Sequence, residues 1–293
     1  MAAISHSDFV MDPKMSMGPV ALRVRDLDST REFYVEELGL RIARQDGNIT
    51  ELAPVKSSEG LVTLIHDPEA ITPSRNSAGL YHFAMLLTSR TDLASAYLAL
   101  GNAGITFDGY ADHIVSEALY LSDPEGNGIE IYADKSRRDW KVDDGTPQMG
   151  TYPLDIDSLL LEVKEKSIDE ARAISEGTVI GHVHLKVTEI RRSTDFYHNR
   201  MGLDLMNYWD TAAFLSAGGY HHHLGMNTWE SSFGTRFEEG RAGLEYFTIR
   251  VPDTSLAADL RVRLADTRQD DSTFQDPDGI KFKIRGTYTL SDK

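Results

Sequence analysis

The chain has 293 residues and a net charge of −16, which comes from 30 basic and 46 acidic side chains. This balance argues against nucleic acid or an anionic membrane as a partner, because both require a basic surface. The sequence contains no cysteine, so any metal must be bound by histidine and carboxylate side chains. The first 18 residues do not read as a secretion signal, and no apolar run approaches membrane-spanning length. We therefore expect a cytoplasmic enzyme or binding protein.

An internal repeat organises the chain. The segment GPVALRV at 18–24 returns as GHVHLKV at 181–187, and each copy precedes a similar amphipathic stretch, DLDSTREFYVEELGL at 26–40 and EIRRSTDFYHNRMGL at 189–203. Because a repeat preserves the residues that a fold needs, the positions at which the copies differ are candidates for chemistry.

The first of four predicted units covers about residues 17–68. It begins with a strand at 19–25 and continues with a helix near 27–37. Two further strands are expected, one around Leu52 and one at 61–66. The unit therefore reads as one strand, one helix and a group of strands.

The second unit covers about residues 79–133 and repeats this order. A strand at 81–87 precedes a helix at 91–104, which has apolar residues at helical spacing and ends at glycine. Strands at 118–123 and 128–134 follow, joined by an Asp-Pro-Glu-Gly turn.

The third and fourth units repeat the pattern in the second half of the chain. The third begins at His182 and includes AAFLSAGG and the strand YHHHLGMN; the fourth begins near Gly243 with LEYFTIRV and a helix at SLAADLRVRLAD. The fourth unit ends in FQDPDGIKFKIR, which repeats the Asp-Pro-acid-Gly turn. Both turns are interpreted as structural.

These units suggest an N-terminal pair at 17–133 and a C-terminal pair at 180–290. The intervening residues 134–179 are polar and irregular, except for a short predicted helix at 154–164. We interpret them as a long connector rather than a domain.

Four strand–helix–strand modules resemble the vicinal oxygen chelate superfamily. Its members include glyoxalase I, extradiol ring-cleaving dioxygenases and antibiotic-resistance binding proteins. The resemblance covers nearly the whole chain outside the tail and the connector. It implies an α+β fold in which βαβββ modules pair into curved mixed sheets, here called cups. In that superfamily the metal ligands come from the first and last strands of a module and point into the cup.

The residues at these ligand positions favour a metal site in the second and third modules. The first-strand position is occupied, in module order, by Pro19, His82, His182 and Tyr246. At the last-strand position the second module has Glu130 and the fourth has Lys283, whereas the first offers only Thr63. The resemblance implies His82, His182 and Glu130 as ligands. Two imidazoles and one carboxylate form the facial triad suited to ferrous iron, and manganese would also fit.

The surrounding motifs are most similar to bacterial catechol 2,3-dioxygenase-like proteins, in which GLYHFA, LYLSDPEGNGIE and SAGGYHHH are typical runs. The segment DHIVSEALYLSDPEGNGIEIY at 112–132 resembles the extradiol signature, in which a histidine and a tyrosine precede the carboxylate ligand. These two residues are His113 and Tyr120, and they are expected to hydrogen-bond the substrate oxygens. The resemblance also points to His222 as an acid–base histidine. It implies an Fe(II) enzyme that inserts both atoms of O2 into a small aromatic diol.

One departure from the familiar two-domain extradiol enzymes concerns which modules supply the ligands. In those enzymes the ligands come from the third and fourth modules, whereas here they fall in the second and third. The second module must therefore share a cup with the third, either within one chain or between two chains of a homodimer. The other cup, from the first and fourth modules, would contain Pro19, Tyr246 and Lys283 and is expected to be metal-free.

Each candidate also has a structural interpretation. A single histidine on a strand is more often a core or surface residue than a ligand, and Glu130 could face solvent. His113 could cap a turn after Asp112, and Tyr120 could be ordinary strand packing. The run His221–His223 could be a solvated strand end.

Two other functions remain open at this point. A glyoxalase-type lyase or isomerase would need a fourth ligand, for which His223 or His222 is the candidate, together with nickel or zinc. A non-catalytic protein that sequesters an aromatic compound would need no metal at all. Within the run His221–His223, side chains alternate on a strand, so that either His222 or the other two would face the cup.

Overall fold

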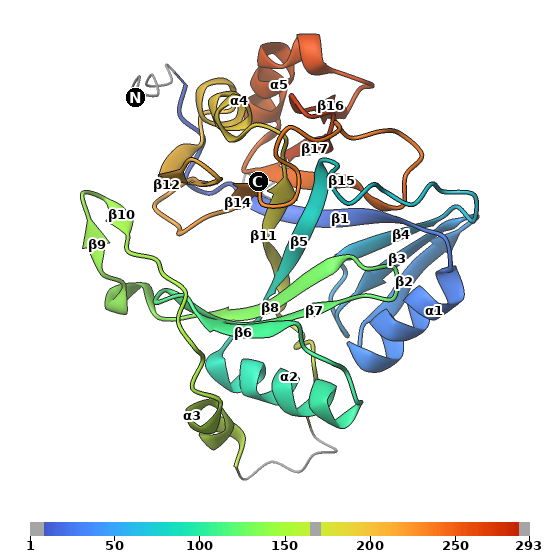
Figure 1. Cartoon of the computed structure of the whole chain (residues 1–293), viewed down its shortest axis with the longest axis vertical. Helices are drawn as coiled ribbons and strands as arrows, with labels where there is room; N and C mark the ends of the chain where they lie inside the picture. The colour runs from blue at the N-terminus through green and yellow to red at the C-terminus, as the bar shows by residue number, and fades with distance from the viewer. Residues whose placement is uncertain (1–8, 165–170, 287–293) are drawn as a thin grey trace, which may run out of the picture.

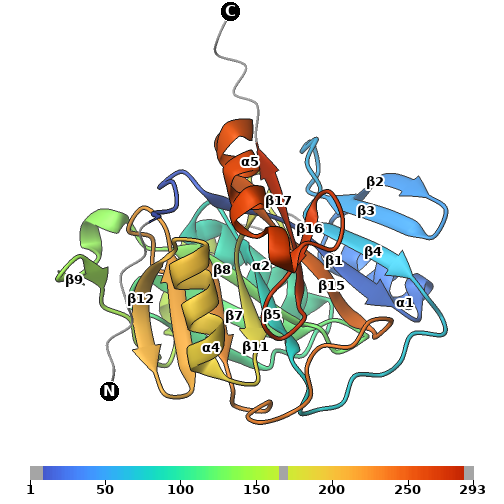
Figure 2. The same ribbon diagram turned by 90° about the horizontal axis from the view of Figure 1, so that it is seen from above.

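The computed structural model of the chain describes residues 9–164 and 171–286. Residues 165–170 of the predicted connector and 287–290 of the predicted C-terminal pair lie outside these ranges. The described residues form two curved mixed sheets with helices packed against them (Figures 1 and 2). The predicted α+β fold is therefore confirmed.

The first module begins with β1 and continues into a short helix. Its strands and helix are β1 (Ser16–Val24), α1 (Leu27–Glu32), β2 (Arg41–Asp46), β3 (Ile49–Ala53) and β4 (Val62–His66). The side chain of Asp26 caps α1 by accepting a hydrogen bond from the Ser29 amide. The predicted helix at 27–37 is α-helical only to Glu32 and continues as a wider π-helical segment, η1 (Phe33–Glu37).

The second module contains the longest helix of the described residues. Its elements are β5 (Gly79–Leu86), α2 (Arg90–Asn102), β6 (Gly109–Asp112), β7 (Ser116–Ser122) and β8 (Gly128–Asp134). Ser89 caps α2 by accepting a hydrogen bond from the Asp92 amide. Strand β6 was not predicted; its four residues alternate too briefly to be recognised from sequence.

The third and fourth modules repeat the same order. The third consists of β11 (Val179–Lys186), α4 (Ile190–Asp195), η5 (Phe196–Arg200), β12 (Asp204–Trp209), β13 (Ala212–Ser216) and β14 (Leu224–Asn227). The fourth consists of β15 (Gly243–Val251), α5 (Thr254–Arg263), η6 (Ala265–Thr267), β16 (Thr273–Gln275) and β17 (Lys281–Gly286). The predicted strand YHHHLGMN is wrong in its first half, because β14 begins only at Leu224 and the histidine run lies in the preceding bend.

The connector is more structured than predicted. Its elements are η2 (Arg137–Asp139), β9 (Val142–Asp143), β10 (Thr146–Pro147), α3 (Ile156–Leu160) and η3 (Leu161–Val163). The last two occupy the predicted helix at 154–164, and β9 and β10 form a small unpredicted hairpin. No helix within the described ranges combines the length and apolar character needed to cross a bilayer.

The sheets combine modules that are distant in sequence. One sheet has the order β12-β13-β14-β11-β5-β8-β7-β6 and the other β16-β17-β15-β1-β4-β3-β2. At the centre of the first, β5 runs antiparallel to β11, and the two strands lie side by side in Figure 1. The second module therefore shares a cup with the third, as predicted, and of the two alternatives left open the structure shows the pairing within one chain. Each sheet draws strands from both 17–133 and 180–290.

Alternation along the strands separates the core from the concave face of the eight-stranded sheet. On β5, Phe83 and Met85 belong to the main hydrophobic core, whereas His82 and Ala84 project from the other face. Helix α2 packs against β7 and β8, and Figure 2 shows α4 against the opposite end of this sheet. The helices thus cover the core side, which leaves the concave side open for a site.

Two equivalent contacts connect the sheets. The hydroxyl of Tyr34 donates to Asp123 and the hydroxyl of Tyr197 donates to Asp276, each over 3.1 Å. Each aspartate begins one of the Asp-Pro-acid-Gly turns. The first module is thereby joined to the second and the third to the fourth, so the turns act as structural clamps.

Candidate metal centre and substrate cavity

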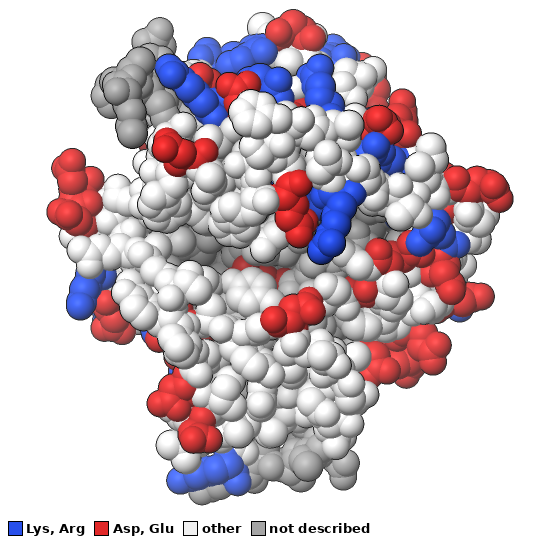
Figure 3. All heavy atoms as spheres, in the orientation of Figure 1, with Lys and Arg blue, Asp and Glu red and all other residues white. Residues whose placement is uncertain are grey.

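A cavity of about 880 Å³ opens on the concave face of the eight-stranded sheet. Its walls come from the second and third modules and from connector residues 149–151. Figure 3 shows a hollow on this face surrounded largely by uncharged side chains. A concave, mostly apolar space with few polar groups is typical of a small-molecule site.

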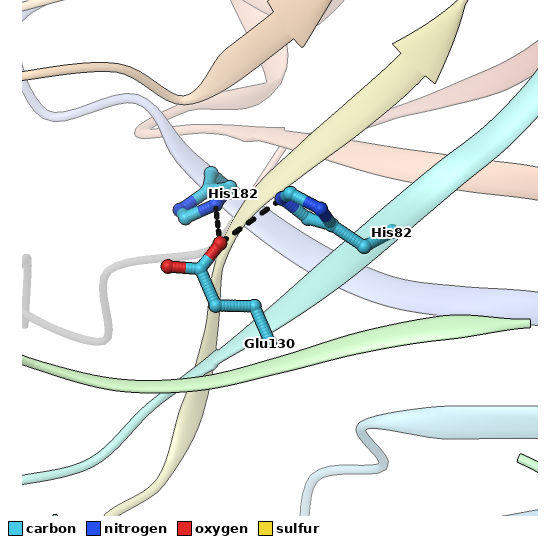
Figure 4. A group of neighbouring side chains, drawn as sticks. All are labelled: His82, Glu130 and His182. Atoms are coloured by element: carbon cyan, nitrogen blue, oxygen red, sulfur yellow. Dashed lines mark hydrogen bonds and ion pairs between the residues drawn. The ribbon is translucent and has the colours of Figure 1, made fainter. Parts of the chain in front are cut away.

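Three side chains cluster beside this cavity (Figure 4). Two of them, His82 and Glu130, line it, and His182 lies against Glu130. His82 projects from β5, Glu130 from β8 and His182 from β11, and all three are buried. The Nε2 atoms of both histidines lie 3.0 Å from Oε2 of Glu130. The cluster forms within one chain, so no second subunit is needed to assemble it.

The strand register explains this convergence. Ala84 pairs with Glu130 on one side and with His182 on the other. These two side chains therefore flank Ala84 on the same face, and its methyl group is small enough to let them approach. His82 lies two residues earlier on β5 and so points to the same face.

Electrostatics favour an ionised Glu130 carboxylate beside a neutral His182 imidazole. Burial alone would raise the pKa of Glu130, but its interactions with His182 and then His82 hold that pKa well below the usual value. Burial lowers the pKa of His182 from 6.5 to about 4, although Glu130 acts in the opposite direction. A neutral imidazole and an ionised carboxylate are the protonation states that metal ligation requires.

The residues present fit a divalent metal. The three potential ligand atoms all lie within 4.8 Å of one another. Nε2 of His82 is buried and close to Glu130, but it lacks the geometry of a hydrogen bond and has no other partner among the described residues. A buried polar atom without a partner is costly, and coordination would satisfy it. Within the ranges that the structure describes, this is the one group of at least three histidine or carboxylate side chains that could hold a metal ion.

His113 and Tyr120 meet at the cavity wall. Nδ1 of His113 lies 2.8 Å from the carbonyl of Gly150, and Nε2 lies 2.6 Å from the Tyr120 hydroxyl. Because a carbonyl can only accept, Nδ1 carries the proton and Nε2 accepts from Tyr120. Burial, followed by the charge of Glu130, raises the pKa of Tyr120 well above 10.0. The turn cap at this point is made by Asp112, whose carboxylate accepts from the Ile114 amide.

Within the histidine run, His222 lines the cavity, whereas His221 and His223 do not. The rings of His222 and His182 have centroids 4.1 Å apart. Burial lowers the pKa of His222 well below 6.5, and nearby His182 lowers it further. Nδ1 of His223 instead lies 3.0 Å from the Ser216 hydroxyl, and His223 does not belong to the three-residue cluster.

His184 also lines the cavity. Its Nε2 accepts a hydrogen bond of 3.0 Å from the amide of Asn227. Its ring lies over Gly225 of the neighbouring strand, and a Cβ atom at that glycine would come within 2.9 Å of the ring. Burial, followed by the charge of His82, lowers the pKa of His184 well below 6.5. This imidazole is therefore a neutral part of the wall.

Two parts of the cavity wall were not predicted from the sequence: its aromatic side chains and the residues from the connector. Trp209, Phe214 and Trp229 of the third module line one side of the cavity. Aromatic residues carry no signal for a site until the fold brings them together. Residues 149–151 reach the cavity from a segment that was interpreted as a simple connector, and Gly150 also holds His113.

Comparison with known proteins gives a consistent family assignment. The chain is 39% identical over 241 residues to catechol-2,3-dioxygenase of Bacillus subtilis (strain 168), covering 80% of this chain and 82% of the relative. It is 29% identical over 115 residues to biphenyl-2,3-diol 1,2-dioxygenase 3 of Rhodococcus globerulus, covering 39% of this chain and 60% of that protein.

Solved structures and family signatures agree on the fold. Glyoxalase I from Zea mays superposes with a TM-score of 0.55 and 17% identity, covering 92% of each chain. Residues 16–131 and 179–284 match the family described as the Glyoxalase/Bleomycin resistance protein/Dioxygenase superfamily. Because this match covers most of the chain, the chain belongs to this superfamily.

Proposed function

We propose that the protein is an extradiol dioxygenase that inserts both atoms of O2 into a catechol-type substrate at a non-haem Fe(II) site. The observation that carries this proposal is the His82–Glu130–His182 cluster, two members of which, His82 and Glu130, line the same cavity as His222 and Tyr120. The relative at 39% identity, catechol-2,3-dioxygenase, supports the same reaction class.

His82, His182 and Glu130 would hold the iron as a facial triad, and Mn(II) is the alternative metal. A 2-His-1-carboxylate set is typical of ferrous oxygenases because it leaves coordination positions open. When bound, the iron would supply Lewis acidity for the diol and a binding position for oxygen.

The remaining polar groups would bind the substrate and move its protons. Nε2 of His222 would accept a proton from a hydroxyl of the bound diol and later return it to the oxygen-derived group. A neutral imidazole suits this role near neutral pH. The Tyr120 hydroxyl donates its hydrogen bond to His113, so its oxygen is free to accept a hydrogen bond from a substrate hydroxyl. Holding the diol in this way would orient it for ring opening beside the two hydroxyl carbons.

The cavity walls would bind the aromatic ring. Phe214 contacts the His184 ring edge-on at a centroid distance of 5.6 Å, and the Trp229 ring is tilted against it at 5.8 Å. Stacking and edge-to-face contacts of this kind stabilise a flat ring. A cavity of about 880 Å³ is larger than catechol itself requires and leaves room for ring substituents.

Ligand number weakens the glyoxalase-type alternative. A four-ligand site would require another side chain close to the cluster, and His223 is instead hydrogen-bonded to Ser216. Within the described residues, no further histidine or carboxylate joins the cluster. We therefore place the lyase reaction second.

The test is oxygen uptake after anaerobic loading with ferrous iron, with catechol and substituted catechols as substrates. We expect uptake together with a yellow ring-fission product, and loss of both in His182→Ala. Metal binding without oxygen uptake on any catechol, combined with turnover of a hemithioacetal, would favour the lyase. Failure to bind metal would favour a non-catalytic binding protein.

A further inference from the structure

A chain of hydrogen bonds runs from His222 away from the cavity. Nδ1 of His222 lies 2.8 Å from Nδ1 of His221, and Nε2 of His221 lies 3.1 Å from Oδ1 of Asp134. The side chain of His221 is 1% exposed and that of Asp134 is 24% exposed. These hydrogen bonds therefore connect the cavity with the partly exposed carboxylate of Asp134 through the buried imidazole of His221.

The direction of each hydrogen bond follows from chemistry. An ionised carboxylate can only accept, so Nε2 of His221 carries a proton. With one proton on each of the two imidazoles, His221 protonated on Nε2 has an unprotonated Nδ1. Because one member of the Nδ1–Nδ1 pair must donate, the donor is His222. Its Nδ1 is then protonated and its Nε2 keeps the lone pair.

We propose that Asp134 and His221 are positioning residues that hold neutral His222 in the tautomer protonated on Nδ1, with Nε2 unprotonated toward the cavity. The catalytic consequence rests on the proposed function, because only an unprotonated Nε2 can take a proton from a bound diol. The opposite tautomer would present an N–H to the cavity and could only donate. A carboxylate that orients a base through its far nitrogen is an established device in other enzymes.

The position of Asp134 links this chain to the metal cluster. Asp134 lies on β8 four residues after Glu130, so both side chains project from the same face of the strand. One strand would thus supply a metal ligand at one point and set the tautomer of the base at another. A change in the position of β8 would affect both together.

Packing around the two imidazoles keeps this arrangement rigid. The His221 ring lies 4.0 Å from that of Tyr220 and 5.6 Å from that of Trp140, measured between centroids. On the cavity side, Phe214 approaches the His222 ring edge-on at 5.0 Å. Aromatic neighbours on both sides hinder a ring flip, which would put Cδ2 in the place of Nδ1 and break the contact between the two Nδ1 atoms. The hydrogen-bond direction is therefore decided by Asp134 and not by ring rotation.

A direct test reads the tautomer itself. Full-length, metal-free protein labelled with 15N-histidine would be examined by two-dimensional 1H–15N spectroscopy at neutral pH, with His222→Gln identifying the signals. We expect the wild-type His222 to be protonated on Nδ1. Asp134→Asn, whose amide can donate instead, and His221→Phe, which keeps a ring but removes the acceptor, should populate the form protonated on Nε2.

Kinetics of the iron-loaded variants then separate positioning from a merely structural role. We expect kcat to fall at least about 10-fold in Asp134→Asn and His221→Phe, with KM for catechol changed less than about 3-fold and iron content unchanged. Asp139→Asn, an exposed acid on η2, serves as the matched control. Melting temperatures would exclude variants that do not fold.

The spectra decide the inference independently of the dioxygenase activity. A wild-type His222 protonated on Nε2, or a tautomer that neither Asp134→Asn nor His221→Phe alters, would overturn it. If no catechol is turned over but the tautomer responds to Asp134→Asn, the proposed reaction fails and the positioning role stands.

Discussion

The two cups share one backbone plan but carry different side chains at equivalent positions. In the eight-stranded sheet Ala84 pairs with Glu130, and in the seven-stranded sheet Thr248 pairs with Lys283. Both pairs join the first and last strands of a module in the same parallel register. A carboxylate in one cup is thus replaced by an ammonium group in the other.

The positions next to this pair also carry potential metal-ligating residues in one cup and not in the other. Tyr246 occupies the position of His82 in the repeat, and Nζ of Lys283 lies 3.7 Å from the centroid of its ring. This is a cation–π contact, where the other cup has a carboxylate between two imidazoles. Pro19, at the position of His182, offers no ligand atom. The fold therefore supplies the geometry, whereas a few side chains on one face decide whether it can bind a metal.

The largest effect is expected at the position where one cup has Glu130 and the other has Lys283. Glu130→Gln keeps the shape of the side chain but removes its charge, and should lower iron affinity and catechol turnover more than about 100-fold, since even outer contacts of a metal site contribute 10- to 100-fold. Lys283→Gln at the equivalent position should leave both within about 2-fold. Iron content after dialysis and oxygen uptake measure the effect. Equal losses in the two variants would contradict the comparison.

The two clamp turns differ in their response to pH. Burial, followed by the charge of Asp278, raises the pKa of Asp276 from 3.8 to about 7. The folded state then binds this proton more tightly than the unfolded state, so the stabilisation is present below pH 4 and is lost as pH rises toward 7. Relative to Asp276→Asn, the wild type should lose on the order of 2 kcal/mol of unfolding free energy between pH 5 and 8.

Urea denaturation of the metal-free protein at several pH values measures this loss. Asp123 of the other turn provides the matched case: burial raises its pKa, while hydrogen bonds from Asn127 lower it. We expect Asp123→Asn to change the pH dependence less than Asp276→Asn. Parallel pH profiles for the wild type and Asp276→Asn would refute the assignment.

A smaller effect is expected at the cavity wall. Tyr120 pairs with Glu130 and Thr273 pairs with Lys283, so the two residues occupy equivalent positions. Tyr120→Phe removes the hydroxyl between His113 and the cavity and should lower kcat for catechol about 10-fold. Thr273→Val should have no effect on turnover. Steady-state oxygen uptake checks both, and an unchanged kcat in Tyr120→Phe would remove this residue from the proposed reaction.

The smallest effects are expected at the two equivalent clamps, which test whether the two halves are stabilised alike. Tyr34→Phe and Tyr197→Phe each delete one hydrogen bond of 3.1 Å to a turn aspartate. Each should cost about 1 kcal/mol of unfolding free energy, measured by urea denaturation at pH 7, with little change in turnover. Strongly unequal losses would show that the two clamps are not energetically equivalent.

Much of the architecture could be predicted from local sequence. The repeat of 18–24 at 181–187 identified equivalent strands, and the alternation of polar and apolar residues placed His82, Glu130 and His182 on strand faces. Helix boundaries were less predictable: α1 changes to a π-helical segment at Phe33, in which Phe33 and Tyr34 are buried, and no local sequence pattern marks this change. The strand assigned to the histidine run was wrong for a related reason, since three consecutive polar residues carry no period.

Local sequence specifies the chemical groups and their spacing along each strand, because alternation is a local property of the backbone. It does not specify which strands become neighbours, since β5 and β11 are about a hundred residues apart and pair through long-range contacts. The same holds for Gly150 beside His113 and for Asp134 behind His221. These contacts depend on where the connector and the bend before β14 come to lie, and no local pattern encodes that position.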